Sequence, residues 1–215
     1  MKINDAANTP LPDNRRLDVL SKLLYDVLVE LGEDPSRPGL VKTPQRWAEA
    51  LITYTQGMTQ EPEEHLNVIF KLEEDDYPSE SDDMVLLDNI QFVSTCEHHM
   101  APIRGVAHIG YIPNNKSRVI TGLSKIARVV SVFANRLQVQ EQLTQQIATA
   151  IDKHLDPLGV IVVIQAVHYC MIQRGVRQHD TRTLTTARRG AFLSKSELEF
   201  KFQEYLKLKI NTNNL

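Results

Sequence analysis

The sequence predicts an α+β protein built around an antiparallel sheet. Its hydrophobic periodicity gives the order helices, two strands, two helices, two strands and a closing helix over 215 residues. Strands and helices come in groups rather than alternating singly, which argues against βαβ units and a parallel sheet. Apolar residues make up 42% and charged residues 24%, as in ordinary globular domains, so one substantial core is expected.

The N-terminal part reads as two helices. Leucine and valine recur at helical spacing over residues 15–31, and Gly32 supplies a stop. Thr43 and Pro44 predict the start of a second helix, with Thr43 as its cap and the proline in its first turn. This helix is expected to end near Gly57.

An acidic stretch separates this part from the rest. Residues 61–83 hold ten acidic residues and one lysine, a net charge of −9, with little periodicity. Such a stretch predicts a loop with one helical turn at most. We therefore divide the chain into a helical extension with an acidic loop, residues 1–83, and a second domain, residues 84–215.

Four segments of the second domain read as strands. Residues 84–94 and 102–113 form the first pair, and a turn is expected at 114–117. Residues 160–172 are rich in β-branched side chains and predict a buried strand, and residues 181–186 predict the last one.

Two amphipathic helices lie between the strand pairs, and a closing helix over 194–208 follows them. The apolar stripes of the two helices consist of Ile126, Val129, Val130, Phe133 and Leu137, and of Leu143, Ile147, Ile151 and Leu155.

Charge is distributed unevenly, although the net charge is only −3. Residues 104–189 carry twelve Lys/Arg against four Asp/Glu, or +8. This balance suits a polyanionic small molecule such as a nucleoside triphosphate, although a solvated surface would look the same. No dense basic stripe points to nucleic acid. Residues 1–16 lack the apolar stretch of a secretory signal, and no run is long enough to span a membrane, so a cytoplasmic location is expected.

The two cysteines of the chain lie in two histidine-bearing clusters, residues 96–99 (Cys-Glu-His-His) and 168–170 (His-Tyr-Cys). Two thiolates and an imidazole are ligands that zinc prefers, and three protein ligands leave a fourth position for water or substrate. Cys96 and His99 can converge in a turn. In a strand, His168 and Cys170 would face one side. The alternatives are an inert buried cysteine, or a structural zinc with four protein ligands.

Two helix starts carry groups suited to a nucleotide. Residues 122–128 predict a helix start capped by Ser124, where Lys125 and Arg128 add positive charge to the helix dipole and favour an anion. Glu141 opens the next helix. A carboxylate there commonly complements the helix dipole, but it also matches two donors on the edge of a guanine.

Four segments together resemble the GTP cyclohydrolase I family: residues 94–99, 122–128, 137–144 and 168–176. The match runs in order from about residue 43 to residue 192. The resemblance implies the T-fold, a four-stranded antiparallel sheet with two helices on one face. It also implies a homodecamer with sites between subunits, and conversion of GTP and water to 7,8-dihydroneopterin triphosphate and formate in pterin and tetrahydrofolate synthesis.

The resemblance also implies a role for each matching residue. Zn²⁺ would be bound by Cys96, His99 and Cys170, and it would lower the pKa of a bound water. His168 would act as the acid that protonates the purine, and His98 would assist proton transfer. Glu141, helped by Gln140, would anchor the guanine edge. The triphosphate would be held by Ser124, Lys125, Arg128 and Arg174, and by Arg46 from a neighbouring subunit.

Arg188 and Arg189 depart from the family pattern and leave the local packing open. Two alternatives stay open beside the cyclohydrolase. One is a T-fold relative that binds nucleotides or pterins without turnover. The other is a T-fold enzyme acting on a dihydropterin or a 7-deazaguanine nitrile. The complete set of metal and phosphate residues argues against both.

Overall fold

The structure, a computed structural model, describes residues 13–73 and 83–210. The chain forms two compact units, residues 1–55 and residues 56–215, and each is described by itself. No helix within the described ranges is long and apolar enough to cross a membrane.

The N-terminal unit is a pair of packed helices, α1 (Asp13–Glu30) and α2 (Thr43–Tyr54). Leu24 and Leu28 of α1 and Ala48 of α2 are among its buried apolar side chains. The stop at Gly32 is confirmed: its φ is +82°, its N–H bonds to Val29, and the next N–H bonds five residues back to Leu28. Only glycine adopts this left-handed conformation without strain, which explains why α1 ends there.

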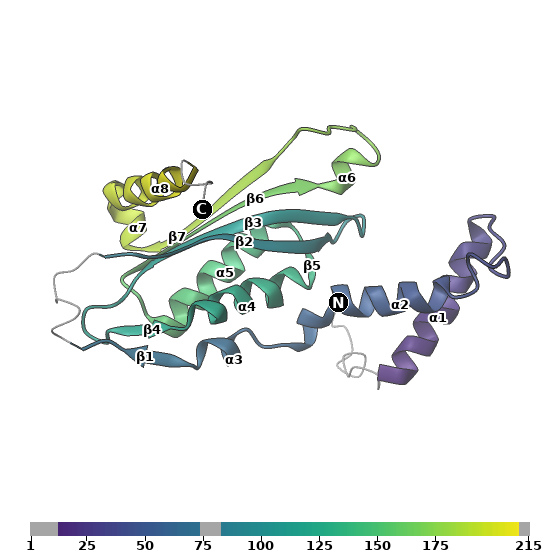
Figure 1. Cartoon of the computed structure of the whole chain (residues 1–215), viewed down its shortest axis with the longest axis horizontal. Helices are drawn as coiled ribbons and strands as arrows, with labels where there is room; N and C mark the ends of the chain where they lie inside the picture. Colours follow the sequence, from purple (N-terminus) through teal and green to yellow (C-terminus); the bar gives the residue numbers. More distant parts are fainter. Residues whose placement is uncertain (1–12, 74–82, 211–215) are drawn as a thin grey trace, which may run out of the picture. The chain divides into compact units, whose positions relative to one another are not determined.

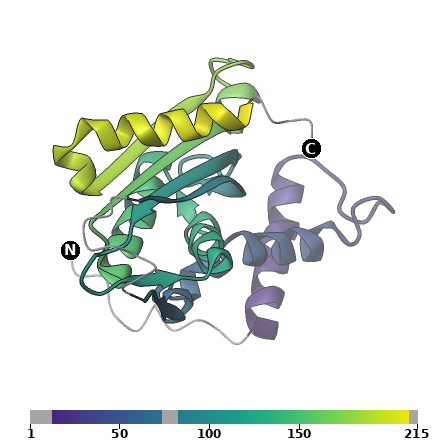
Figure 2. The ribbon, with the colours of Figure 1, turned by 60° about the vertical axis from the view of Figure 1, so that its left-hand side comes forward.

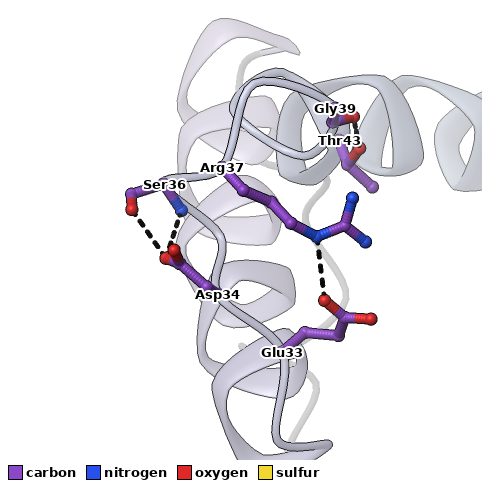
Figure 3. Close-up of polar contacts among 6 residues, drawn as sticks. All are labelled: Glu33, Asp34, Ser36, Arg37, Gly39 and Thr43. Atoms are coloured by element: carbon purple, nitrogen blue, oxygen red, sulfur yellow. Dashed lines mark hydrogen bonds and ion pairs between the residues drawn. The ribbon is translucent and has the colours of Figure 1, made fainter.

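Local polar contacts order the loop between α1 and α2 (Figure 3). The Arg37 guanidinium bonds to Glu33 at 3.0 Å, and the Asp34 carboxylate accepts bonds from the backbone and hydroxyl of Ser36. The expected cap at Thr43 is wrong. Thr43 is the first residue of α2, and its hydroxyl donates back to the Gly39 carbonyl at 3.4 Å, while Lys42 occupies the cap position without a side-chain bond.

The second unit is built on a five-stranded sheet in the order β5-β2-β3-β6-β7. Four long strands pair antiparallel: β2 (Val85–Cys96), β3 (Pro102–Ile112), β6 (Gly159–His168) and β7 (Thr183–Gly190). The antiparallel sheet is therefore confirmed, but its expected four strands are not the full count. A short β5 (Leu137–Gln138) adds to β2 in parallel.

The fifth strand changes one helix assignment. Helix α4 (Leu123–Ala134) is capped at Asn135, so Leu137, expected on its apolar stripe, instead lies in β5 and is 37% exposed. Two residues are too few to show a strand periodicity, so sequence pattern could not reveal β5. A separate two-stranded sheet pairs β1 (Ile69–Lys71) with β4 (Val119–Thr121).

Helices cover both faces of the main sheet (Figures 1 and 2). On one face lie α4 and α5 (Gln140–Leu155), where Ile126, Ile147 and Val162 are fully buried in the main core. On the opposite face lies α8 (Ser196–Ile210), after the single turn α7 (Ala191–Ser194). Phe202 packs there with Ile161 in a second, smaller cluster. The pleat of β6 thus serves two cores at once.

The units divide earlier than the predicted boundary after residue 83. Residues 56–73 belong to the second unit, because their elements contact α4, α5 and β4. Arg136 donates to the carbonyls of Gly57 and Gln60, both at 2.8 Å. A Cβ on Gly57 would lie 2.0 Å from the Val132 carbonyl oxygen, so only glycine fits. The elements are η2 (Gln56–Thr59), α3 (Glu63–Leu66) and β1. Residues 74–82 of the expected acidic loop lie outside the described residues.

Arg188 and Arg189 hold the last strand between the two helical layers. Arg188 forms a 2.7 Å ion pair with Glu199 of α8. Arg189 points to the other face, where it donates to Gln145 at 2.8 Å and Thr149 at 3.0 Å on α5. Their departure from the family pattern therefore has a structural explanation.

A histidine supports a bulge in β2, and this predicts a pH-dependent stability. Asn89 has φ +54° where the β2–β3 register shifts, and its N–H donates to Nδ1 of His108 at 3.2 Å. Burial lowers the pKa of His108, and the Asp88 carboxylate opposes that shift. Glu199 and Lys207 of α8 face it across a cavity of about 340 Å³. Because protonation at Nδ1 removes the acceptor, the folded state disfavours the charged ring.

We expect the urea midpoint to fall as pH decreases below about 6.5, the ordinary histidine pKa, because the unfolded chain then binds more protons than the folded one. The decline should level off below the folded pKa. The substitution His108→Asn keeps an acceptor without a titrating group and should flatten the profile. Equal slopes for both proteins, at one protein concentration, would contradict this expectation.

Candidate metal centre and active site

Cys96, His99 and Cys170 converge as expected. One ligand atom from each lies within 4.8 Å of the other two, and Cys96 Sγ is 3.8 Å from His99 Nδ1. Cys96 ends β2, where its N–H bonds to the Ala101 carbonyl, and the next residues form a tight turn through the bonds of His99 and Met100 back to the Cys96 carbonyl. That turn folds His99 back over the thiol.

Cys170 reaches the cluster by an unexpected route. The strand expected over 160–172 ends at His168, and α6 (Tyr169–Ile172) forms one helical turn. His168 and Cys170 therefore do not share one face of a strand, and that prediction is wrong. The change follows from backbone bonding: the N–H of Gln173 bonds to the Tyr169 carbonyl, so the chain leaves the sheet where pairing with β3 stops at Ile103–His168.

The three side chains fit a zinc ion by chemistry and by spacing. Zinc bonds of about 2.3 Å to sulfur and about 2.0–2.1 Å to nitrogen, at tetrahedral angles, separate those ligand atoms by about 3.6 Å. The observed 3.8 Å between Cys96 and His99 matches that separation. Burial and the neighbouring Cys96 raise the pKa of the Cys170 thiol, whereas Arg174 lowers it. A bound cation would act against this rise in the Cys170 pKa, because cysteine binds a metal as the thiolate.

His168 lies at the end of β6 beside this cluster. Its Nε2 is 2.8 Å from Oε1 of Gln140, the first residue of α5. Burial lowers the pKa of His168, and the Glu141 carboxylate acts in the opposite direction. Glu141 is exposed at the start of α5, so a carboxylate faces the same site without being buried.

His98 is exposed between two site residues. Its side chain is 63% exposed, its Nε2 lies 3.6 Å from Glu97 Oε1, and its ring meets that of His99 edge-on at 6.1 Å. A histidine in this position can exchange protons with solvent while its neighbour His99 faces the cysteines.

The expected phosphate residues lie at the start of α4 and after α6. Gly122, not Ser124, is the cap of α4, and no side chain bonds to the first-turn amides, so the expected serine cap is wrong. Ser124 and Arg128 are exposed, Lys125 is half-buried, and Arg174 is exposed. Within the described ranges these three cations form no ion pair. Arg46 is exposed on α2 of the N-terminal unit, and the structure gives no relation between it and these residues.

The sequence names Gln140 only as a helper of Glu141 and does not reveal the hydrogen-bond network around it. Gln140 is 0% exposed, and its amide bonds to β6 and β7 as well as to His168. Thr185 and Thr144 complete this network. No signal in the sequence could identify it, because the network joins residues up to 45 positions apart.

Comparison with known proteins gives consistent matches. The family model described as GTP cyclohydrolase I matches residues 20–207. A protein named GTP cyclohydrolase 1 from Thermobifida fusca is 48% identical over 80% of each chain. Another of that name, from Chlorobium phaeovibrioides, is 46% identical over 93% of this chain and 84% of its own. One from Porphyromonas gingivalis is 53% identical over 77% of this chain and 81% of its own. A solved structure, archaeosine synthase QueF-Like in the apo form, matches 52% of this chain and 98% of its own with a TM-score of 0.42 and 15% identity. This similarity is too low to support a conclusion.

Proposed function

The chain belongs to the GTP cyclohydrolase I family of enzymes, and we propose that it converts GTP and water to 7,8-dihydroneopterin triphosphate and formate with the help of zinc. This reaction would begin pterin and tetrahydrofolate synthesis. The observation that carries the proposal is the convergence of two cysteines and a histidine beside His168, with the exposed Glu141 nearby.

Cys96, His99 and Cys170 would hold the zinc ion. When bound, zinc supplies an electrophilic centre that makes a water molecule nucleophilic near neutral pH. Three protein ligands would leave room for water or substrate at the ion, as a catalytic zinc site requires. The T-fold of the family supplies the frame in which strand β2 and helix α6 bring these ligands together.

The two other histidines would move protons. His168 is half-buried and anchored by Gln140, so its ring has a defined orientation, which suits a group that protonates the purine. His98 is exposed and close to Glu97, which suits proton exchange with solvent during ring opening. The difference in burial between the two histidines supports this division of roles.

Charged residues would bind the two ends of GTP. The exposed carboxylate of Glu141 would accept bonds from the guanine edge, as two oxygens match two donors. Lys125 and Arg128 lie three residues apart on α4, and they would hold the triphosphate with Ser124 and Arg174. Gln140 differs from Glu141, because its amide is buried and hydrogen-bonded inside the subunit.

The site would be completed by a neighbouring subunit in a homo-oligomer, which we propose to be a decamer. Among the described residues, β2 pairs on its outer side only at Thr95 and Cys96, and β7 forms the other edge of the sheet. Two exposed apolar residues mark these edges, Val93 at 57% and Leu184 at 66%. Unpaired edges of this kind favour pairing with another copy.

Subunit mixing tests whether the sites are shared. Arg46→Ala and His168→Ala are each expected to be inactive alone. Assembled together at equal amounts, they should regain about a quarter of wild-type turnover, because that fraction of sites would combine intact residues from two subunits. Light scattering should give about ten times the 24.4 kDa chain mass. No regain in mixed assemblies, or full turnover by a monomer, would contradict the shared site.

The function itself is tested with purified, zinc-loaded protein and GTP. We expect formate release together with a pterin product that fluoresces after oxidation. Absence of both products at full zinc loading would reject the proposed reaction, and GTP binding without turnover would indicate a binding protein instead.

A further inference from the structure

The orientation of the Gln140 amide is determined by its surroundings. Its Nε2 lies 3.0 Å from the Ile164 carbonyl oxygen, 3.1 Å from the Thr183 carbonyl oxygen and 3.0 Å from the Thr185 hydroxyl. Carbonyl oxygens only accept hydrogen bonds, so the atom that faces two of them must be the nitrogen. The amide oxygen therefore faces His168.

The hydroxyls of Thr144 and Thr185 support the same assignment. The Thr144 hydroxyl donates its only proton to the backbone carbonyl of Gln140, at 2.7 Å. In the 2.7 Å contact between Thr144 and Thr185, the proton must then come from Thr185. Thr185 then has no proton left for Gln140, so its 3.0 Å contact again requires a donor on Gln140, which is the nitrogen; the two protons of that nitrogen are shared among three acceptors.

The oxygen of Gln140 fixes the protonation of His168. Oε1 carries no proton, so the 2.8 Å contact with His168 Nε2 is a hydrogen bond only when Nε2 is protonated. In the neutral imidazole the other nitrogen, Nδ1, then carries the lone pair. The bonds of Gln140 to β6 and β7 hold the oxygen in place, and hence the ring.

We propose that Gln140 is a positioning residue that holds His168 as the Nε2–H tautomer, so that Nδ1 is the nitrogen that exchanges a proton with the substrate. This inference rests on the proposed function for the identity of the substrate, but the tautomer itself does not depend on it. It replaces the expected contact of Gln140 with guanine, because a side chain that is 0% exposed, with its nitrogen and oxygen both engaged, cannot reach a ligand without breaking these bonds.

The wild-type protein tests the tautomer directly, and a substitution is needed only to assign the signals. Solid-state NMR of sedimented protein labelled with ¹⁵N-histidine, at a pH well above the ordinary histidine pKa of about 6.5, distinguishes the protonated from the unprotonated ring nitrogen. The His168 signals are those lost in His168→Gln. We expect a single Nε2–H form, and the Nδ1–H form or a mixture would overturn the proposal.

Two variants test the positioning role. Gln140→Met keeps the length but removes the acceptor, whereas the control Gln145→Met makes the same change on the same helix, at an exposed side chain that bonds to Arg189 outside the network. For Gln140→Met we expect mixed tautomers, kcat lower by about 30-fold or more and KM within about 3-fold of wild type. Gln145→Met should keep the single tautomer and stay within about 3-fold of wild type in kcat.

Other outcomes are equally decisive. Equal losses in both variants would show a merely structural role. A raised KM with unchanged kcat in Gln140→Met would instead support the contact of Gln140 with guanine. If Gln140→Met fails to fold, judged by zinc content and light scattering, the wild-type spectrum decides. A wild-type protein with the Nε2–H tautomer but no formate release would contradict the proposed function and leave this inference standing.

Discussion

Cys170→Ser should lose both its metal and its turnover. A serine hydroxyl stays protonated near neutral pH, so the cluster keeps only Cys96 and His99 as ligands. Outer-shell partners of a metal site typically contribute 10- to 100-fold in affinity, so we expect loss of a direct ligand to exceed about 100-fold. Elemental analysis of freshly purified protein should find little zinc, and formate release should fall to the detection limit.

The neighbouring Met171 provides a matched control. It lies on the same single turn, α6, and is half-buried like Cys170. Met171→Leu should retain zinc and turnover, which would separate loss of a ligand from disturbance of the turn. Stoichiometric zinc together with wild-type turnover in Cys170→Ser would show that the ion is held elsewhere, and the proposed metal centre would be abandoned.

His168→Ala should separate proton transfer from metal binding. The ring is not among the three converging ligands, so zinc content should stay at the wild-type level. Turnover should fall by about 10²- to 10⁴-fold, the usual contribution of a positioned acid or base. The substitution also leaves Gln140 Oε1 without its partner, which costs about 1–3 kcal/mol in the free energy of unfolding.

A histidine outside the site serves as the comparison for this variant. His65, on α3, is half-buried, and His65→Ala should release formate at the wild-type rate. Zinc content, light scattering and the urea midpoint of His168→Ala need to be measured in parallel, so that a folding defect is recognised. Near-normal turnover by folded His168→Ala would show that the acid is another group.

Periodic segments of the chain are predictable because their signal is local. The apolar stripe of α5, with Leu143, Ile147 and Ile151, repeats every three or four residues, and all three side chains are fully buried. The β-branched run of β6 likewise predicts a buried strand. The chemistry of Cys96 and His99 is also readable, since few residue types bind zinc and these two lie within one turn.

Errors arose where long-range pairing overrides a local signal. Residues 169–172 are apolar and follow a β-branched run, so they resemble a continuing strand, yet pairing with β3 ends at His168 and a helical turn forms. Leu137 continues a helical spacing but pairs with Thr95 in β5. In both cases the deciding partner lies more than 40 residues away, beyond any pattern window.

By itself, the sequence determined the pairing of helices with antiparallel strands, the types of metal-binding side chains and the charge that suits a polyanion, because periodicity and functional groups are properties of short segments. Tertiary structure alone decided how Cys170 reaches Cys96, which strand edges stay open and that Gln140 orients His168 from within the core. Those outcomes depend on which distant backbone groups bond to each other, and on which side chains that bonding buries.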